Sequence, residues 1–74
     1  MSLEIDPAVL RRFGSEVRSA RKGFGMTLAV LANEMGTTKK HICQIENAKG
    51  GAGFMLTLRL IDYLGLDVSE VVGG

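Results

Sequence analysis

The stretch from Thr27 to Ala48, TLAVLANEMGTTKKHICQIENA, constrains the fold more than any other part of the chain. Two short segments with helical spacing of apolar residues flank Gly36, which can adopt a left-handed backbone conformation and so reverse the chain. Ala32 is small enough to let a second helix approach the first closely. Ile42 and Ile45 are three residues apart and would hold one face of that second helix against the first. The pattern therefore predicts two short helices that cross at a steep angle around a tight turn.

The opposite face of the second predicted helix is polar and basic, and it carries Lys39, Lys40 and Gln44. A helix packed on one side and polar on the other is typical of the second helix of a helix-turn-helix, which lies in the major groove of DNA. Lysine can donate to guanine O6 and N7, and glutamine can pair with adenine. We therefore predict that these three side chains contact bases. An ordinary solvated helix face is the alternative.

Residues around this helix are further candidate contacts. Thr38 is first of all an N-cap, but its methyl group can also contact a thymine methyl. His41, in the first turn, can reach a phosphate or a base. Asn47, Lys49 and the glycines that follow suit phosphate contact through side chains and backbone N–H groups. A cap and a flexible surface loop explain the same residues without DNA, and that alternative stays open.

Arg21 and Glu46 form a predicted ion pair. If the helix that carries Glu46 packs beside the first helix, the pair becomes partly buried and fixes geometry more than it stabilises. The same pair would orient Arg21 towards a phosphate, and Thr27 completes the set of predicted phosphate contacts. Two separately solvated charges are the alternative.

Helical periodicity recurs along the rest of the chain, and no run alternates apolar and polar residues for long. The sequence therefore predicts an all-α fold in a single domain, residues 1–74, with an ordered core of about residues 7–72. Caps and glycines divide it into five helices, which span Pro7 to the glycines at 23 and 25, about 28–35, about 39–48, about 54–64, and a short segment after Asp67.

The first predicted helix contains a glycine in its middle, Gly14. Glycine there costs roughly 1 kcal/mol relative to alanine, so we expect close packing against another element at this point. Arg11, Arg12 and Arg18 of the same helix are expected to face solvent.

The net charge of +1 hides an uneven distribution. Residues 7–49 contain eight basic and three acidic side chains, a net of +5, and the remainder contains one basic and five acidic side chains, a net of −4. A polarised small domain suits a polyanion on one side, although a solvated basic helix gives the same pattern.

One cysteine, Cys43, rules out an internal disulfide and favours a reducing, cytoplasmic setting. No apolar run approaches the roughly 18 residues of a membrane span, and the N-terminus lacks the pattern of a signal peptide.

The sequence offers no catalytic set. It has one histidine and one cysteine, no glycine-rich phosphate motif after a strand, and no paired carboxylates in a pocket-forming context. His41 and Cys43 are two residues apart on different faces of a helix, so they do not suggest a metal site. We therefore expect no enzymatic activity, no metal and no cofactor.

Four segments together resemble the lambdoid phage repressor and Cro family, also called the XRE-type helix-turn-helix family. They are GTTKKHICQIENAK (36–49), VRSAR (17–21), LAVLANEMG (28–36) and LGLDVSEVV (64–72). The resemblance covers about residues 13–72. It implies a compact five-helix, lambda-repressor-like DNA-binding domain that binds operator DNA as a homodimer and regulates transcription. It also implies base contacts by Lys39, Lys40 and Gln44, and an Arg21–Glu46 pair.

The chain departs from the family at two positions. The family usually has glutamine, which helps to hold phosphate, where this chain has Leu28. It usually has glycine after the third helix, where this chain has Ala48, and the following loop is rich in glycine and lacks the common proline.

The predicted function is a sequence-specific DNA-binding transcriptional regulator, a repressor, that binds double-stranded DNA. As a homodimer on a pseudo-palindromic operator, it would place two recognition helices about 34 Å apart. One alternative is an antitoxin-like autorepressor that also binds a toxin. Another is a protein-interaction module that keeps the fold without reading DNA. The apolar residues that could form either the dimer contact or the core are Phe54, Met55, Leu66, Val68, Val71 and Val72.

Overall fold

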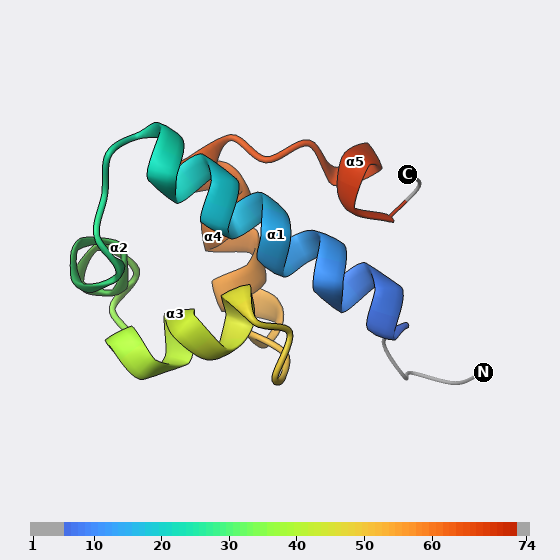
Figure 1. Cartoon of the computed structure of the whole chain (residues 1–74), viewed down its shortest axis with the longest axis horizontal. Coiled ribbons are helices and arrows are strands. Elements are labelled where there is room, and N and C mark those ends of the chain that lie inside the picture. Colours follow the sequence, from blue (N-terminus) through green and yellow to red (C-terminus); the bar gives the residue numbers. More distant parts are fainter. Residues whose placement is uncertain (1–5, 73–74) are drawn as a thin grey trace.

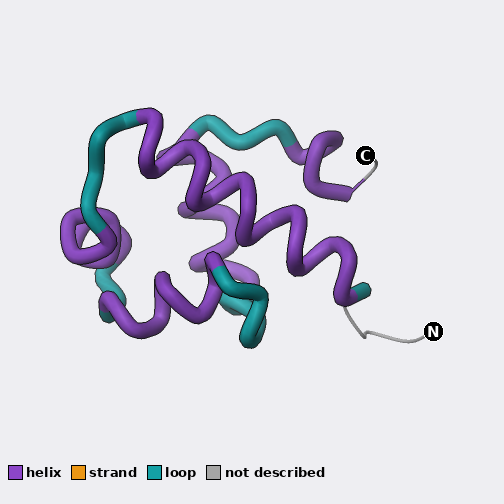
Figure 2. Tube along the Cα trace, viewed as in Figure 1, coloured by secondary structure: helices purple, strands orange, loops and turns teal. Residues whose placement is uncertain are grey.

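The computed structural model describes residues 6–72, and every regular element in that range is a helix (Figure 1). The helices are α1 (Pro7–Gly23), α2 (Leu28–Met35), α3 (Lys39–Glu46), α4 (Phe54–Leu64) and α5 (Val68–Val72). Four of them have eight residues or more, whereas α5 has five. The loops between them are short, as the trace in Figure 2 shows. The predicted all-α class is confirmed, and residues 1–5 and 73–74 of the predicted domain lie outside the described range.

Local capping explains where the helices begin and end. At the start of α1, Asp6 Oδ1 accepts a hydrogen bond from the Ala8 N–H at 2.8 Å, and Pro7 occupies the first helical position. Pro7 lacks an N–H that would have no partner there in any case. At the end of α4, Gly65 adopts a left-handed conformation with φ 67°, which lets the chain leave the helix.

The end of α3 differs from the prediction. The helix ends at Glu46, two residues before the expected Ala48. The Cys43 carbonyl accepts the backbone N–H of Asn47 at 3.1 Å, and the Asn47 side chain adds a second hydrogen bond to it through Nδ2 at 2.8 Å. Ala48 then takes φ 56°, in the left-handed region that α-helices exclude. The helix stops there because Ala48 leaves helical geometry.

The core lies where α1 meets α3, α4 and α5, and where α2 meets α3 and α4. In Figure 1, α1 crosses the molecule in front of α4, with α3 below it and α5 beside its N-terminal half. All five helices supply apolar residues that are buried in the core. They are Phe13, Val17, Leu31, Ala32, Met35, Ile42, Ile45, Leu60, Leu64 and Val71.

The backbones of α1 and α3 approach each other closely at Gly14. A Cβ atom at this position would lie 2.9 Å from the Glu46 carbonyl oxygen and would collide with that of Ile45. Both are backbone atoms, so neither can rotate away as the end of a side chain would. The expectation that close packing requires this glycine is therefore confirmed.

Arg12 was predicted to face solvent, but its side chain is bonded within the protein. Its Nε donates to the Val71 carbonyl at 2.7 Å, and the residue is half-buried. The bond joins α1 to α5 across 59 positions of the sequence, and it satisfies a carbonyl at the end of the short helix. Arg11 and Arg18 are exposed, as expected.

The apolar residues that the sequence left between core and dimer contact fall into two groups. Val71 is buried in the core and Leu66 packs partly against it. Phe54, Met55 and Val68 are exposed, by 77%, 62% and 50%. The side chain of Val72 lies outside the description.

Candidate nucleic-acid interface

The turn between α2 and α3 is fixed at both of its ends. Thr27 caps α2 by accepting a hydrogen bond from the Val30 N–H at 3.1 Å. Gly36 ends α2 in the left-handed conformation, with φ 69° and ψ 33°, and the Thr37 N–H then donates back to the Ala32 carbonyl at 2.9 Å. Two residues after Gly36, Thr38 begins the capping of α3, its Oγ1 accepting from the His41 N–H at 3.1 Å. The connection is therefore short and conformationally defined.

The two faces of α3 have different environments. Ile42 is fully buried and Ile45 is 2% exposed, so this side of the helix is held against the core. Lys39, Lys40 and Gln44 are exposed. The helix thus presents a polar, basic side to the outside, and its rotation about its own axis is fixed by the two isoleucines.

Cys43, for which the sequence suggested neither a disulfide nor a metal site, also lies on this outer side. It is exposed, and it lies between Lys40 and Asn47 at spacings of three and four residues, which places them along one stripe of the helix. The Asn47 Nδ2 lies 3.4 Å from its sulfur atom. The helical spacing from Lys40 was the signal that could have placed it on this face.

His41 lies at the edge of the same helix and is half-buried. Its Nδ1 lies 2.9 Å from Thr37 Oγ1, so the ring is tied to the turn that precedes α3. The contact limits the positions open to the ring and leaves Nε2 as the nitrogen that an external group could reach.

Arg21 and Glu46 join α1 to α3 with the geometry of a two-point ion pair. Arg21 Nε donates to Glu46 Oε2 at 2.7 Å, and Nη2 donates to Oε1 at 3.1 Å. Arg21 Nη1 donates to the Met26 carbonyl at 2.9 Å. The hydrogen bonds to Glu46 raise the pKa of the guanidinium despite the opposing effect of burial.

This arrangement decides what Arg21 can do. The residue is 8% exposed, and all three of its guanidinium nitrogens donate to groups of the protein itself. The pair is buried as the sequence suggested, and three of the five guanidinium N–H groups donate within the protein. Arg21 therefore holds α3 in position, and its expected phosphate contact stays a prediction.

The segment after α3 has backbone hydrogen bonds to the helix at its start and glycines with positive φ further on. Asn47 is used as a cap, as described above, and the Lys49 N–H donates to the Gln44 carbonyl at 2.8 Å. The Lys49 side chain is exposed. Gly50 and Gly53 have φ values of 146° and 77°, which side chains rarely adopt, so the loop path depends on these glycines.

Leu28, the departure from the family pattern at the start of α2, packs partly against the core. It therefore contributes to packing where a polar residue would reach outward. The N-terminal turn of α2 keeps its backbone N–H groups and the positive end of its dipole.

Other kinds of site find no support in the described part of the chain. Within residues 6–72, no group of three or more His, Cys, Asp and Glu side chains is arranged to hold a metal ion. None of the helices described is both long and apolar enough to cross a bilayer. No protein-family model, curated protein or solved structure matches this chain.

Proposed function

We propose that this protein is a sequence-specific DNA-binding transcriptional regulator of the XRE type, with α2 and α3 as its helix-turn-helix. On this proposal the fold is a lambda-repressor-like domain, α3 lies in the major groove, and the protein represses transcription in the cytoplasm as a homodimer. One observation carries the proposal: the side of α3 with Lys39, Lys40 and Gln44 is exposed, while Ile42 and Ile45 hold its other side rigidly. A recognition helix needs both properties.

The residues divide into roles by their surroundings. The base contacts are Lys39, Lys40 and Gln44, with Thr38 at the helix start where its methyl group remains available. Phosphate contacts come from His41, Asn47 and Lys49, in or just after α3, and from Thr27, the N-cap of α2. Arg21 and Glu46 are positioning residues, because the buried pair between them sets the placement of α3 against α1.

The decisive experiment is selection of bound sequences from a random pool of DNA duplexes. A regulator of this kind should enrich one motif with two-fold symmetry and half-sites separated by about one helical turn. The affinity for a random duplex should fall steeply as the salt concentration rises. Binding releases cations from the DNA phosphates, and a higher salt concentration opposes that release. Absence of an enriched motif together with salt-independent binding would refute the proposal and favour a protein-interaction module.

Two substitutions test the assignment of α3. We expect Lys40→Ala and Gln44→Ala each to weaken binding to the selected sequence by roughly 1–3 kcal/mol, because each removes a contact to a base edge. Both residues are exposed, so the melting temperature should change little. Arg59→Ala, an exposed arginine of α4, serves as the charge-matched control and should retain full sequence preference. Equal affinity of the Lys40 and Gln44 variants and the parent for the selected sequence would contradict the assignment.

A further inference from the structure

The single histidine of the chain, His41, is tied to the turn before α3 at two points. Its backbone N–H donates to Thr38 Oγ1 at 3.1 Å, and its ring nitrogen Nδ1 lies 2.9 Å from Thr37 Oγ1. Thr37 is half-buried, and its own N–H donates to the Ala32 carbonyl at 2.9 Å, which fixes its place in the turn. The Thr38 hydroxyl already caps α3, so the start of the helix does not require the hydroxyl of Thr37.

The contact between Thr37 and His41 bears on which ring nitrogen carries the proton. A neutral imidazole has one N–H and one lone pair, and the bond made by one nitrogen sets the state of the other. Thr37 Oγ1 makes no other hydrogen bond within residues 6–72, so its proton is free to point at Nδ1. Nε2 then carries the ring proton, and no group of the described chain accepts a hydrogen bond from it.

The surroundings of His41 suit an anionic acceptor. The residue lies in the first turn of α3, at the positive end of the helix dipole, and Lys39 and Lys40 are exposed in the same turn. The ion pair among the described residues joins Arg21 to Glu46, so no described carboxylate is paired with the imidazole. A DNA phosphate oxygen accepts hydrogen bonds and donates none, so it needs an N–H and not a lone pair at Nε2.

We propose that Thr37 is a positioning residue for DNA binding: its hydroxyl donates to Nδ1 and holds the His41 ring with Nε2–H directed at a phosphate oxygen. Thr37 itself does not touch the DNA. The role rests on the proposed function, which includes a phosphate contact by His41, and it names the residue that prepares that contact. Because the ring is a donor while neutral, the contact does not require a charged histidine.

Nuclear magnetic resonance of the imidazole tests the tautomer without DNA. At about pH 8, above the ordinary titration range of histidine, the ¹⁵N signals of the single imidazole report which nitrogen is protonated. The parent chain should show Nε2–H and an unprotonated Nδ1. Thr37→Val removes only the hydroxyl and should shift both signals towards those of a free imidazole, whereas Thr37→Ser should restore them. An Nδ1–H tautomer in the parent, or unchanged signals in Thr37→Val, would overturn the assignment.

A double-mutant cycle on DNA binding tests whether Thr37 acts through the ring. His41→Ala should weaken binding about 10-fold, since a hydrogen bond to a charged group is lost, and Thr37→Val about fivefold, since the donor is no longer held. Selected and random duplexes should be affected equally, because phosphate contacts carry no sequence information. In a His41→Ala background, Thr37→Val should have no further effect.

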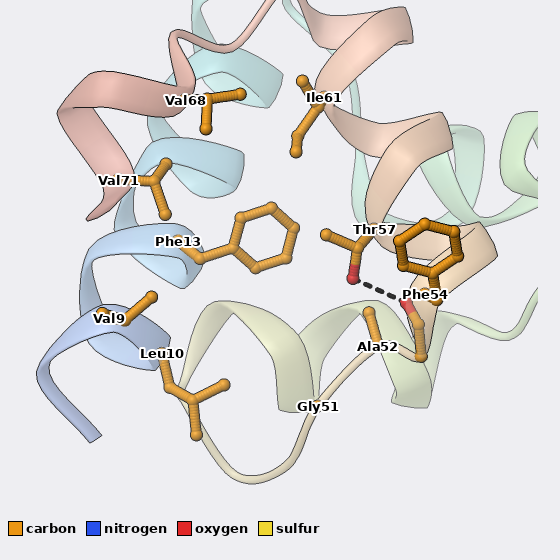
Figure 3. A pocket seen from close by; sticks show the side chains of 11 residues that line it. Val9, Leu10, Phe13, Gly51, Ala52, Phe54, Thr57, Ile61, Val68 and Val71 are labelled. Atoms are coloured by element: carbon orange, nitrogen blue, oxygen red, sulfur yellow. Dashed lines mark hydrogen bonds between the residues drawn. The ribbon is translucent and has the colours of Figure 1, made fainter. Parts of the chain in front are cut away.

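Thr57→Val is the matched control, because Thr57 is also half-buried and its hydroxyl is also bonded within the protein. It donates to the Gly53 carbonyl at 2.6 Å (Figure 3). Thr57 lines an apolar pocket of about 380 Å³ that α1, the loop before α4, α4 and α5 form, with Phe54 at its edge. None of the lining residues belongs to α2 or α3, so this variant should change neither the imidazole signals nor the affinity for DNA.

The outcomes separate this role from the proposed function. Equal losses from Thr37→Val in the parent and in the His41→Ala background would show that Thr37 acts on the turn alone, and would end the case. The same holds if Thr37→Ser binds as weakly as Thr37→Val while both melt at the temperature of the parent. A selected motif that depends on Gln44 but tolerates Thr37→Val leaves the proposed function standing without this role. Random-duplex binding that depends on Thr37 through His41, with no motif selected, refutes sequence-specific regulation and supports the role of Thr37.

Discussion

Replacing Gly14 with alanine sets two physical effects against each other. On an open helix surface, alanine in place of glycine stabilises by about 1 kcal/mol, because glycine loses more backbone entropy on folding. At Gly14, however, the new Cβ would meet the carbonyl oxygens of Ile45 and Glu46. Since these belong to the backbone of α3, the two helices must move apart.

The magnitude follows from what that separation disturbs. Overpacking of a close contact costs about 1–3 kcal/mol. Here it also loosens Ile45, which is 2% exposed, and the ion pair of Arg21, which lies two helical turns from Gly14 on the same side of α1. We expect a net loss of about 2 kcal/mol, from a total stability on the order of 5 kcal/mol for a domain of this size.

Thermal unfolding followed by circular dichroism measures the effect. A loss of 2 kcal/mol should lower the midpoint by about 10 °C in a chain of this length. Gly23→Ala is the matched control, because Gly23 also lies in α1 and a Cβ there would have nothing within 4 Å. Its midpoint should stay the same or rise. A Gly14→Ala variant as stable as the parent would refute the argument that helix packing, rather than helix propensity, decides this position.

Two further substitutions test the local energetics. Arg21→Ala leaves the Glu46 carboxylate, whose side chain is 5% exposed, without its partner, and should cost about 3–5 kcal/mol in urea unfolding and weaken DNA binding. The double variant Arg21→Met, Glu46→Leu should regain most of that stability, and an unchanged midpoint for Arg21→Ala alone would rule out a structural role for the pair. Ala48→Gly should raise stability by about 1 kcal/mol, because it relieves a left-handed conformation with φ 56°. Ala52→Gly is the control and should lower stability, because φ at Ala52 is not positive. A similar loss of stability for Ala48→Gly would contradict the argument that the backbone of Ala48 is strained.

Much of the helix pattern was predictable because it depends on neighbours in sequence. Asp6, Thr27 and Thr38 cap the helices that follow them, and each bond spans only two or three residues. Gly36 ends α2 by a backbone conformation that glycine adopts without strain. The early end of α3 escaped prediction because it depends on the left-handed conformation of Ala48, and alanine is a good helix former that rarely adopts that conformation.

The candidate interface was predictable to a similar degree. The spacing of Ile42 and Ile45 sufficed to orient α3, since the buried side of a helix determines its exposed side. The direction of the Arg21 guanidinium was not predictable. It depends on how closely α1 approaches α3 and on the Met26 carbonyl that accepts its third hydrogen bond.

By itself the sequence determined most of the helix bounds, the caps of α1, α2 and α3 and the side of α3 that turns inward, because propensity, capping and periodicity act over a few residues. Tertiary structure alone decided which apolar side chains are buried in the core and which are exposed on the surface. Val71 is buried while Val68 stays half exposed, and Arg12 reaches a carbonyl 59 residues away. Those outcomes depend on the relative placement of helices distant in sequence, which no local pattern specifies. The pocket beside Phe54 has the same origin, since α1, α4 and α5 enclose it only after they have packed together.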